Sequence, residues 1–169
     1  MIAEFQGKTP KLHPSTMLFP SADVIGDVEL GEEVCVWPGA VVRGDLNYVK
    51  VGRCTNIQDN VVLHPTEEFP VVVGDYVTIG HGAIVHACVV RDRCLIGMGA
   101  VVLDGAEIGE ESIIAAGAVV APNSKIPPRS MVMGVPGKVV RGLSAEEASN
   151  MVRHAIYYMN LARKHFPAR

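Results

Sequence analysis

The chain has 169 residues, a mass of 18.1 kDa and a formal net charge of −3. A weakly acidic chain of this length predicts one domain and argues against nucleic acid or a membrane surface as the main partner. Hydrophobic residues make up 49% of the chain and aromatic residues only 5%, so the core must be built from small aliphatic side chains.

The N-terminal segment Met1–Lys8 lacks the basic start and the apolar stretch of a secretory signal. No apolar run approaches the ~20 residues of a membrane-spanning helix. We therefore expect a cytoplasmic protein that does not bind membranes. The cysteines form no Cys-x-x-Cys pair, so we expect reduced and mostly buried thiols, with a Cys88–Cys94 disulfide as the alternative.

An aliphatic residue recurs every six positions through most of the chain. This spacing is neither the 3.6-residue period of a helix nor the alternation of one long strand. It is typical of short strands separated by tight corners, with three strands to a turn and each aliphatic side chain directed inward. Grouped by turn, the series is Leu30, Val36, Val42; Val51, Ile57, Leu63; Val73, Ile79, Val85; Val90, Ile96, Val102; and Ile108, Ile114, Val120.

The repeat predicts an all-β solenoid, and it resembles the hexapeptide-repeat proteins, which implies a left-handed parallel β-helix. After the repeat, Ser144–Glu147 has the pattern of a capping box, and the apolar spacing that follows is helical. We expect a single domain over residues 1–169. The β-helix should cover about residues 15–135, and a C-terminal α-helix over 144–165 should pack on it.

Three histidines occupy special places in the repeat. His64 and His86 directly follow the third aliphatic residue of successive turns, as Arg43 does one turn earlier, so these side chains should stack about 4.8 Å apart. Two imidazoles at that spacing can share one zinc ion. His81 belongs to a different face and would reach the pair only across an interface between chains. The sequence therefore predicts three metal sites per trimer, each with three protein ligands and an open position for water.

The surplus residues of the repeat gather at one corner. The intervals from Val42 to Val51 and from Leu63 to Val73 are the longest, and both end a turn, which predicts loops on the same side. Gln58 should lie one turn below His81, where it could hydrogen-bond a water on the metal. Arg43 and Asp45 could pair within one chain or between chains. The remaining histidines, His13, His154 and His165, have no place in this frame and are expected on the surface.

Four segments together are similar to the γ-class carbonic anhydrase family, over nearly the whole chain: Arg43-Gly44-Asp45, Asn56-Ile57-Gln58-Asp59, Val62-Leu63-His64 and Gly80–His86. The resemblance implies reversible hydration of CO2 to bicarbonate by a metal-bound hydroxide at the interface of a homotrimer. It implies that His64 and His86 of one chain and His81 of the next hold the metal.

The same resemblance assigns further roles. It implies an Arg43–Asp45 contact across the interface and a Gln58 that orients the hydroxide. It also implies that Asn56 is one of the catalytic residues. Tyr158 and Asn160 resemble a helical Tyr-x-Asn whose Asn helps to position the substrate. Zn2+ is the expected cofactor, although imidazoles also accept Fe2+ and Co2+.

The chain departs from the family pattern at the proton-transfer step. Leu46 stands where the best-known members carry Glu, and the loop Pro65–Pro70 is short. Glu67, or Glu68 beside it, is therefore the candidate proton shuttle, and a solvated loop is the simpler alternative. Whether turnover is fast or weak stays open. Two other functions also stay open: a metal-dependent acyl-CoA thioesterase, and a non-catalytic trimeric scaffold or assembly subunit.

Overall fold

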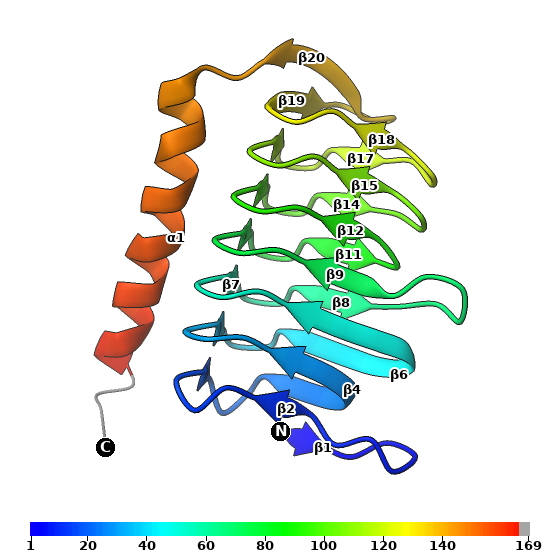
Figure 1. Cartoon of the computed structure of the whole chain (residues 1–169), viewed down its shortest axis with the longest axis vertical. Helices are drawn as coiled ribbons and strands as arrows, with labels where there is room; N and C mark the ends of the chain where they lie inside the picture. Colours follow the sequence, from blue (N-terminus) through cyan, green and yellow to red (C-terminus); the bar gives the residue numbers. More distant parts are fainter. Residues whose placement is uncertain (166–169) are drawn as a thin grey trace.

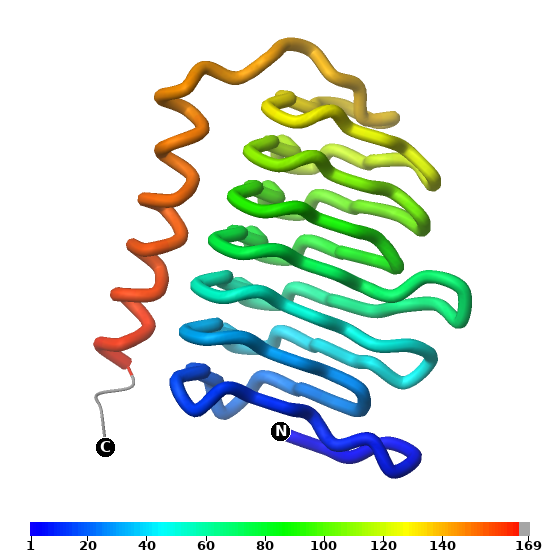
Figure 2. The backbone as a smooth tube through the Cα atoms, in the orientation of Figure 1, coloured from blue at the N-terminus to red at the C-terminus, as the bar shows by residue number. Residues whose placement is uncertain are grey.

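The computed structural model describes residues 1–165 as a prism of short strands wound around one axis, with a helix along its side (Figure 1). The backbone climbs through stacked triangular turns from the N-terminus to the last strands (Figure 2). The fold is the left-handed parallel β-helix expected from the repeat, with one C-terminal helix. Each of its three faces is a stack of strands from successive turns.

Each face can be described by its strands. The first face contains β2 (Lys11–Leu12), the C-terminal halves of β4 (Asp23–Leu30) and β6 (Val41–Val51), then β9 (Val71–Val73), β12 (Val89–Val90), β15 (Glu107–Ile108) and β18 (Lys125–Ile126). The second face contains β3 (Met17–Leu18), β5 (Cys35–Val36), β7 (Asn56–Ile57), β10 (Thr78–Ile79), β13 (Leu95–Ile96), β16 (Ile113–Ile114), β19 (Ser130–Met133) and the antiparallel β20 (Lys138–Gly142). The third face contains β1 (Ile2–Ala3), the N-terminal halves of β4 and β6, then β8 (Val62–His64), β11 (Ile84–His86), β14 (Val101–Val102) and β17 (Val119–Val120).

The core of the prism is built from the repeated aliphatic residues. On the third face Leu63 is in register with Val42 below it and with Val85 above it, and all three are fully buried. The same holds for Ile57 and Ile79 on the second face. Each inward side chain therefore packs on its equivalent one turn away, and the predicted six-residue frame is confirmed.

The surplus residues lie at the expected corner, between the third and first faces. Residues 45–48 bulge out of β6, which pairs with β4 on either side of them. Residues 65–70 form the loop between β8 and β9 that projects from the prism in Figure 1. The strands also begin earlier than residue 15, because β1 and β2 both pair with β4.

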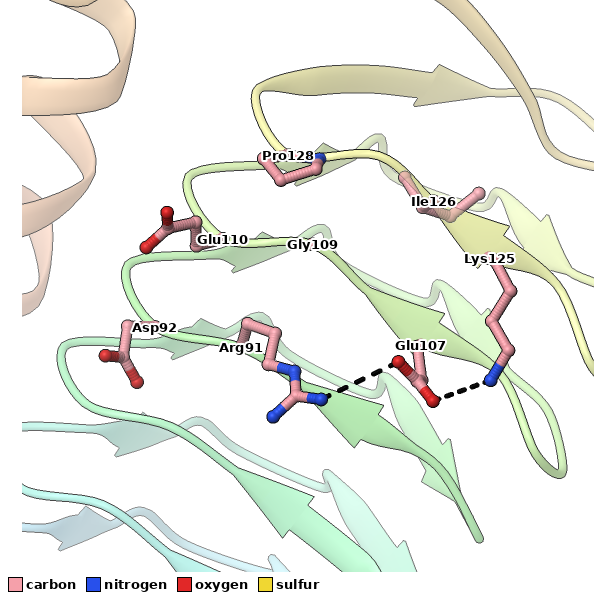
Figure 3. Close-up of a pocket in the computed structure, with 8 residues that line it drawn as sticks. All are labelled: Arg91, Asp92, Glu107, Gly109, Glu110, Lys125, Ile126 and Pro128. Atoms are coloured by element: carbon pink, nitrogen blue, oxygen red, sulfur yellow. Dashed lines mark hydrogen bonds and ion pairs between the residues drawn. The ribbon is translucent and has the colours of Figure 1, made fainter.

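The outward side of the first face carries charged residues that pair between turns. Arg91 and Lys125 reach Glu107 from either side, at 3.6 and 2.6 Å (Figure 3). Lower on the same face, Lys50 lies 3.6 Å from Glu29 on the neighbouring turn. The charged side chains of this face are therefore solvated by water and neutralised by ion pairs with one another.

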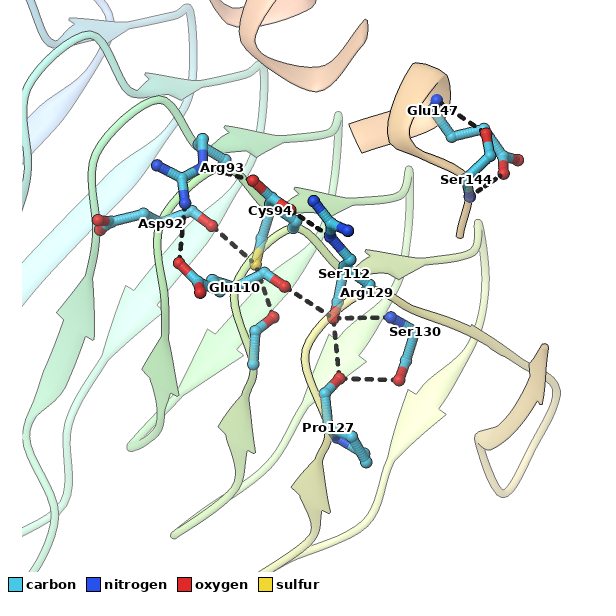
Figure 4. A network of polar contacts seen from close by, with 12 residues as sticks. Asp92, Arg93, Cys94, Glu110, Ser112, Pro127, Arg129, Ser130, Ser144 and Glu147 are labelled. Carbon is cyan, nitrogen blue, oxygen red and sulfur yellow. Dashed lines mark hydrogen bonds and ion pairs between the residues drawn. The ribbon is translucent and has the colours of Figure 1, made fainter. Parts of the chain in front are cut away.

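Helix α1 (Ala145–His165) covers the second face. It starts with the predicted capping box: the Ser144 hydroxyl accepts from the backbone N–H of Glu147 at 3.2 Å, and the Glu147 carboxylate accepts from that of Ser144 at 2.9 Å (Figure 4). Its buried residues, which include Met151, Ala155 and Met159, face the prism. Within residues 1–165, no helix is both long and apolar enough to cross a membrane.

The cysteines conform to the sequence prediction. Cys35, Cys54, Cys88 and Cys94 are all buried and unbridged, so the alternative Cys88–Cys94 disulfide is not formed. Burial raises the pKa of Cys88 and Cys94 to about 12. These thiols are core residues rather than reactive groups.

Candidate metal centre

His64 and His86 lie side by side on the third face. They are register partners on β8 and β11, with ring centroids 5.2 Å apart. Nδ1 of His64 is 3.2 Å from Nε2 of His86. The predicted stacking of the two imidazoles is therefore present within one chain.

Each of these rings is held on its far side by an aspartate. Nε2 of His64 lies 3.1 Å from Oδ1 of Asp45, and Nδ1 of His86 lies 2.6 Å from Oδ1 of Asp104. A carboxylate can only accept, so these two ring nitrogens carry the protons. The two nitrogens that face each other are then both lone-pair acceptors. Such a pair repels unless a proton or a metal ion lies between the rings.

The spacing of the two free nitrogens fits a shared metal ion. Two zinc–nitrogen bonds of about 2.0–2.1 Å at a tetrahedral angle separate the nitrogens by about 3.3 Å. The aspartates behind the rings also correspond to the carboxylate–histidine–metal arrangement that fixes the tautomer of a ligand. The donor set is therefore suited to zinc or a similar divalent ion.

Arg43 and Asp45 act in opposite directions on the pKa of His64, and burial together with Arg43 outweighs Asp45, so the imidazole stays in the neutral form that a ligand requires. Their side chains form an ion pair within one chain, which is one of the two arrangements that the sequence leaves open. Burial, and after it the charge of Arg43, lowers the pKa of His64. Burial alone would raise the pKa of Asp45, but the hydrogen bond from Arg43 and other hydrogen bonds lower it overall. A neutral imidazole thus faces an ionised carboxylate.

His81 lies apart from this pair, after β10 on the second face. Its side chain is 44% exposed, and its Nδ1 is 2.8 Å from Oδ2 of Asp59. By the same reasoning Nδ1 carries the proton and Nε2 has the free lone pair. Within residues 1–165, no group of three or more His, Cys, Asp or Glu side chains is arranged to hold a metal.

Gln58 and Asn56 are buried beside His81. The Gln58 Oε1 accepts from the backbone N–H of His81 at 3.2 Å, and its Nε2 donates to Oδ1 of Asn56 at 3.1 Å. Gln58 and Tyr158 line, together with His81, a groove of about 460 Å³ between the second face and α1. The predicted position of Gln58 one turn below His81 is confirmed.

Two candidates from the sequence lie elsewhere. Asn160 is exposed on α1, where its Oδ1 accepts from Arg163 at 3.4 Å. Glu67 is exposed on the loop after β8, and its backbone carbonyl accepts from Asn47 at 3.2 Å. In the part of the chain that the structure describes, neither side chain has a hydrogen bond or ion pair with His64, His81 or His86.

The structure adds residues that the sequence reasoning missed. Asp59 holds the same place relative to Ile57 as His81 does relative to Ile79, and this signal was available from the repeat. Asp104 lies two residues after the third aliphatic of the turn above His86. The prediction that His154 is a surface residue is wrong, because the ring is half-buried with its Nδ1 3.1 Å from the Thr78 hydroxyl. His13 and His165 are exposed, as expected.

Comparison with known proteins places the chain among proteins of this architecture. The family model for bacterial transferase hexapeptide (six repeats) matches residues 87–122. A solved structure from Bacillus cereus, described as a candidate acetyltransferase, is 39% identical, covers 98% of this chain and 96% of its own, and superimposes with a TM-score of 0.95. The class defined by fold and repeat is therefore the hexapeptide-repeat β-helix.

Two curated relatives define the family more narrowly. The carbonic anhydrase of Geobacillus kaustophilus is 43% identical over 153 residues, which cover 90% of this chain and 84% of the relative. γ carbonic anhydrase 1, mitochondrial, of Arabidopsis thaliana is 42% identical over 164 residues, 94% of this chain and 60% of the relative. The chain thus spans about 60% of the length of this and a second Arabidopsis relative. The protein belongs to the γ-class carbonic anhydrase family.

Proposed function

We propose that the protein catalyses the reversible hydration of CO2 to bicarbonate at a metal site between two chains of a homotrimer. The observation that carries the proposal is the pair of facing lone pairs on His64 and His86, 3.2 Å apart, each ring fixed from behind by a carboxylate. The relatives named as carbonic anhydrases support it.

His81 of a neighbouring chain is the proposed third ligand. Its Nδ1 is held by Asp59, and its ring is among the more exposed side chains of the site. Beside the His64–His86 pair, the third face presents a column of apolar residues that α1 does not cover, with Ile84 39% exposed. Packing of this column against the margin of a neighbouring second face, at the turn after β10 where His81 is exposed, would bring the neighbour's His81 to the pair.

The roles of the chain's own residues follow from their contacts. A zinc ion bound by the histidines would supply an acidified water with a pKa near 7 for attack on CO2. Asp45, Asp59 and Asp104 hold the ligand tautomers. Gln58 keeps one amide N–H free to orient a water or bicarbonate oxygen. Arg43 keeps Asp45 ionised.

Further assignments are proposals from the family pattern. Tyr158, in the groove with His81, and Asn160 are the proposed substrate-positioning residues. Asn56 supports Gln58 through the hydrogen bond between their side chains. Glu67 is the proposed proton shuttle, since its loop leaves the prism directly after His64.

Mixing two inactive variants tests the shared site. His64→Ala chains lack one ligand and His81→Ala chains lack the other, so each homotrimer should bind little metal and hydrate no CO2. When both are unfolded and refolded together, random assembly should restore about a quarter of the sites. Stopped-flow CO2 hydration and bound metal per chain should recover together. If the mixture stays as inactive as its parents, the site is not shared between chains.

The reaction itself is tested with fully metal-loaded wild-type protein. Reconstitution should be carried out separately with Zn2+, Fe2+ and Co2+, the divalent ions that imidazoles accept. CO2 hydration should depend on the metal and disappear in His86→Ala. A fully loaded trimer without turnover would refute the proposed reaction.

One observation favours a second candidate, hydrolysis of an acyl-CoA thioester. The groove beside His81 has a volume of about 460 Å³, within the range of sites for much larger molecules than CO2, and most of its lining is apolar. The Bacillus cereus structure is described as a candidate acetyltransferase, which is also an acyl-group activity. Release of free CoA from short and medium acyl-CoA by the metal-loaded protein would favour this alternative if CO2 hydration is absent.

A further inference from the structure

A continuous line of hydrogen bonds connects helix α1 with the backbone of His81. The His81 N–H donates to Gln58 Oε1 at 3.2 Å, and Gln58 Nε2 donates to Asn56 Oδ1 at 3.1 Å. Asn56 Nδ2 donates to the Thr78 hydroxyl oxygen at 2.9 Å, which lies 3.1 Å from Nδ1 of His154. Strands β7 and β10, the turns that follow them and helix α1 are thus joined by one line of hydrogen bonds.

The direction of this line is fixed at its His81 end. A backbone N–H can only donate, so the Gln58 atom that faces it must be the carbonyl oxygen. The Gln58 nitrogen must then face the Asn56 oxygen, and the Asn56 nitrogen must face Thr78. The proton of the Thr78 hydroxyl remains, and Nδ1 of His154 is the acceptor placed to receive it. All donors therefore point the same way, an arrangement in which each bond polarises the next.

His154 is the terminal acceptor of a buried line. Asn56, Gln58 and Thr78 are each at most 3% exposed, so water cannot readily replace a lost partner. Burial lowers the pKa of His154, which keeps the ring neutral and able to accept. The ring is also held by Tyr158, with centroids 5.0 Å apart.

We infer that His154 is a positioning residue that fixes the Gln58 side-chain amide through Thr78 and Asn56. The inference rests on the proposed function, in which Gln58 uses its remaining amide N–H at the metal site. It assigns a role to the covering helix: α1 closes the second face and also supplies the acceptor that keeps the Gln58 amide in one orientation.

Three substitutions separate this role from packing. His154→Phe keeps a planar ring against Tyr158 but removes the acceptor. His154→Asn returns an acceptor oxygen near the position of Nδ1, so it should restore the line. Thr78→Val has the same shape as Thr and breaks the line one step earlier. The matched control is His165→Phe, the same substitution at an exposed histidine about three turns further along α1.

The primary measurement is the side-chain amide NMR spectrum of Asn56 and Gln58 in metal-free protein. His154→Phe and Thr78→Val should shift these resonances and speed their exchange with solvent. His154→Asn and His165→Phe should leave them close to wild type. Unchanged Asn56 and Gln58 resonances in His154→Phe, or an Asn variant that behaves like the Phe variant, would overturn the inference.

A kinetic measurement connects the line to the reaction. With full metal loading, His154→Phe should lower kcat for CO2 hydration about fivefold with little change in KM, the size expected for one hydrogen bond. His154→Asn should recover most of that loss. If wild-type protein shows no CO2 hydration but the amide response holds, the proposed function fails and the positioning role of His154 stands.

Discussion

The first and third faces belong to the same prism, yet the outward residues of the first are mostly charged and those of the third mostly apolar. Both stack parallel strands over the same buried aliphatic core. In register order, the outward column of the first face is Lys11, Glu29, Lys50, Val72, Val89, Glu107 and Lys125. That of the third face is Asp23, Val41, Val62, Ile84, Val101 and Val119.

This difference indicates what each face contacts. The charged column of the first face forms ion pairs between turns and suits water (Figure 3). The apolar column of the third face is not covered by α1, which lies on the second face, and His64 and His86 lie along its margin. One scaffold can therefore present a charged face to solvent and an apolar face to the proposed partner chain, and the repeat places the proposed metal ligands beside the latter.

The largest expected effect comes from placing a charge on the third face. Ile84→Lys should convert a trimer of about three times 18.1 kDa into monomers, because a buried lysine without a partner is costly at an interface. Bound metal should be lost with the trimer, since His81 would no longer reach the pair. Sedimentation velocity and metal analysis measure both.

Val89→Lys is the matched control for that substitution. Val89 occupies the outward column of the first face, between Val72 and Glu107 in register. A lysine there should leave mass and metal content unchanged. A trimer that survives Ile84→Lys, or one that Val89→Lys dissociates, would show that the third face is not the interface.

Asp104 offers the next largest effect. Asp104→Ala should weaken zinc binding about 10–100-fold, because His86 loses the carboxylate that fixes its tautomer. Asp104→Asn should lose less, since an amide oxygen still accepts from Nδ1. Competition with a chromophoric zinc chelator measures the affinity. Glu107→Gln, a charge change of the same kind on the first face, should have no effect; equal losses in both variants would point to general electrostatics.

As the pH falls, the contribution of His64 on the third face to the free energy of unfolding should change before that of Glu107 on the first face. The lowered pKa of His64 means that the unfolded chain takes up this proton more readily than the folded one, so stability should fall as the pH drops below about 6.5 and level off below the folded pKa. The hydrogen bond and charge of Lys125 lower the pKa of Glu107, so its contribution persists above 4.5 and is lost only as the pH falls through the lowered pKa. Calorimetry of metal-free protein between about pH 8 and pH 2 follows both steps.

His64→Asn is the control for the first of these steps. It removes the titrating group and should flatten the stability profile between about pH 6.5 and the folded pKa of His64. The loss of stability through the lowered pKa of Glu107 should remain. A variant profile with the same slope as wild type would assign the first step to another group.

The sequence predicted the parts of the site that the repeat controls. The six-residue period determines which residues share a face and a register, and this alone places His64 beside His86 and Gln58 below His81. The same period places Asp59 one turn below His81. Fold and ligand positions were predictable because a solenoid repeats one local rule.

The contacts of His154 and Asp45 were not predicted, because they depend on packing outside that rule. His154 contacts Thr78 because of the position at which α1 packs on the second face. The period of the helix is unrelated to that of the strands, so the repeat does not predict this contact. Whether Asp45 turns to Arg43, to His64 or to both depends on the bulge in β6. Such contacts arise from tertiary packing, so spacing along the chain does not reveal them.

The smallest expected effect concerns the ion pairs of the first face. Glu107→Gln should change the thermal midpoint by less than about 2 °C, because exposed ion pairs contribute little and are screened by salt. For the same reason, raising the salt concentration to about 1 M should not lower the midpoint of wild-type protein. A clearly larger drop in both experiments would mean that the charged column helps to hold the turns together. The two faces would then differ in how they stabilise the fold as well as in what they contact. Ion pairs between turns would stabilise the prism on the first face, and subunit contacts would stabilise it on the third.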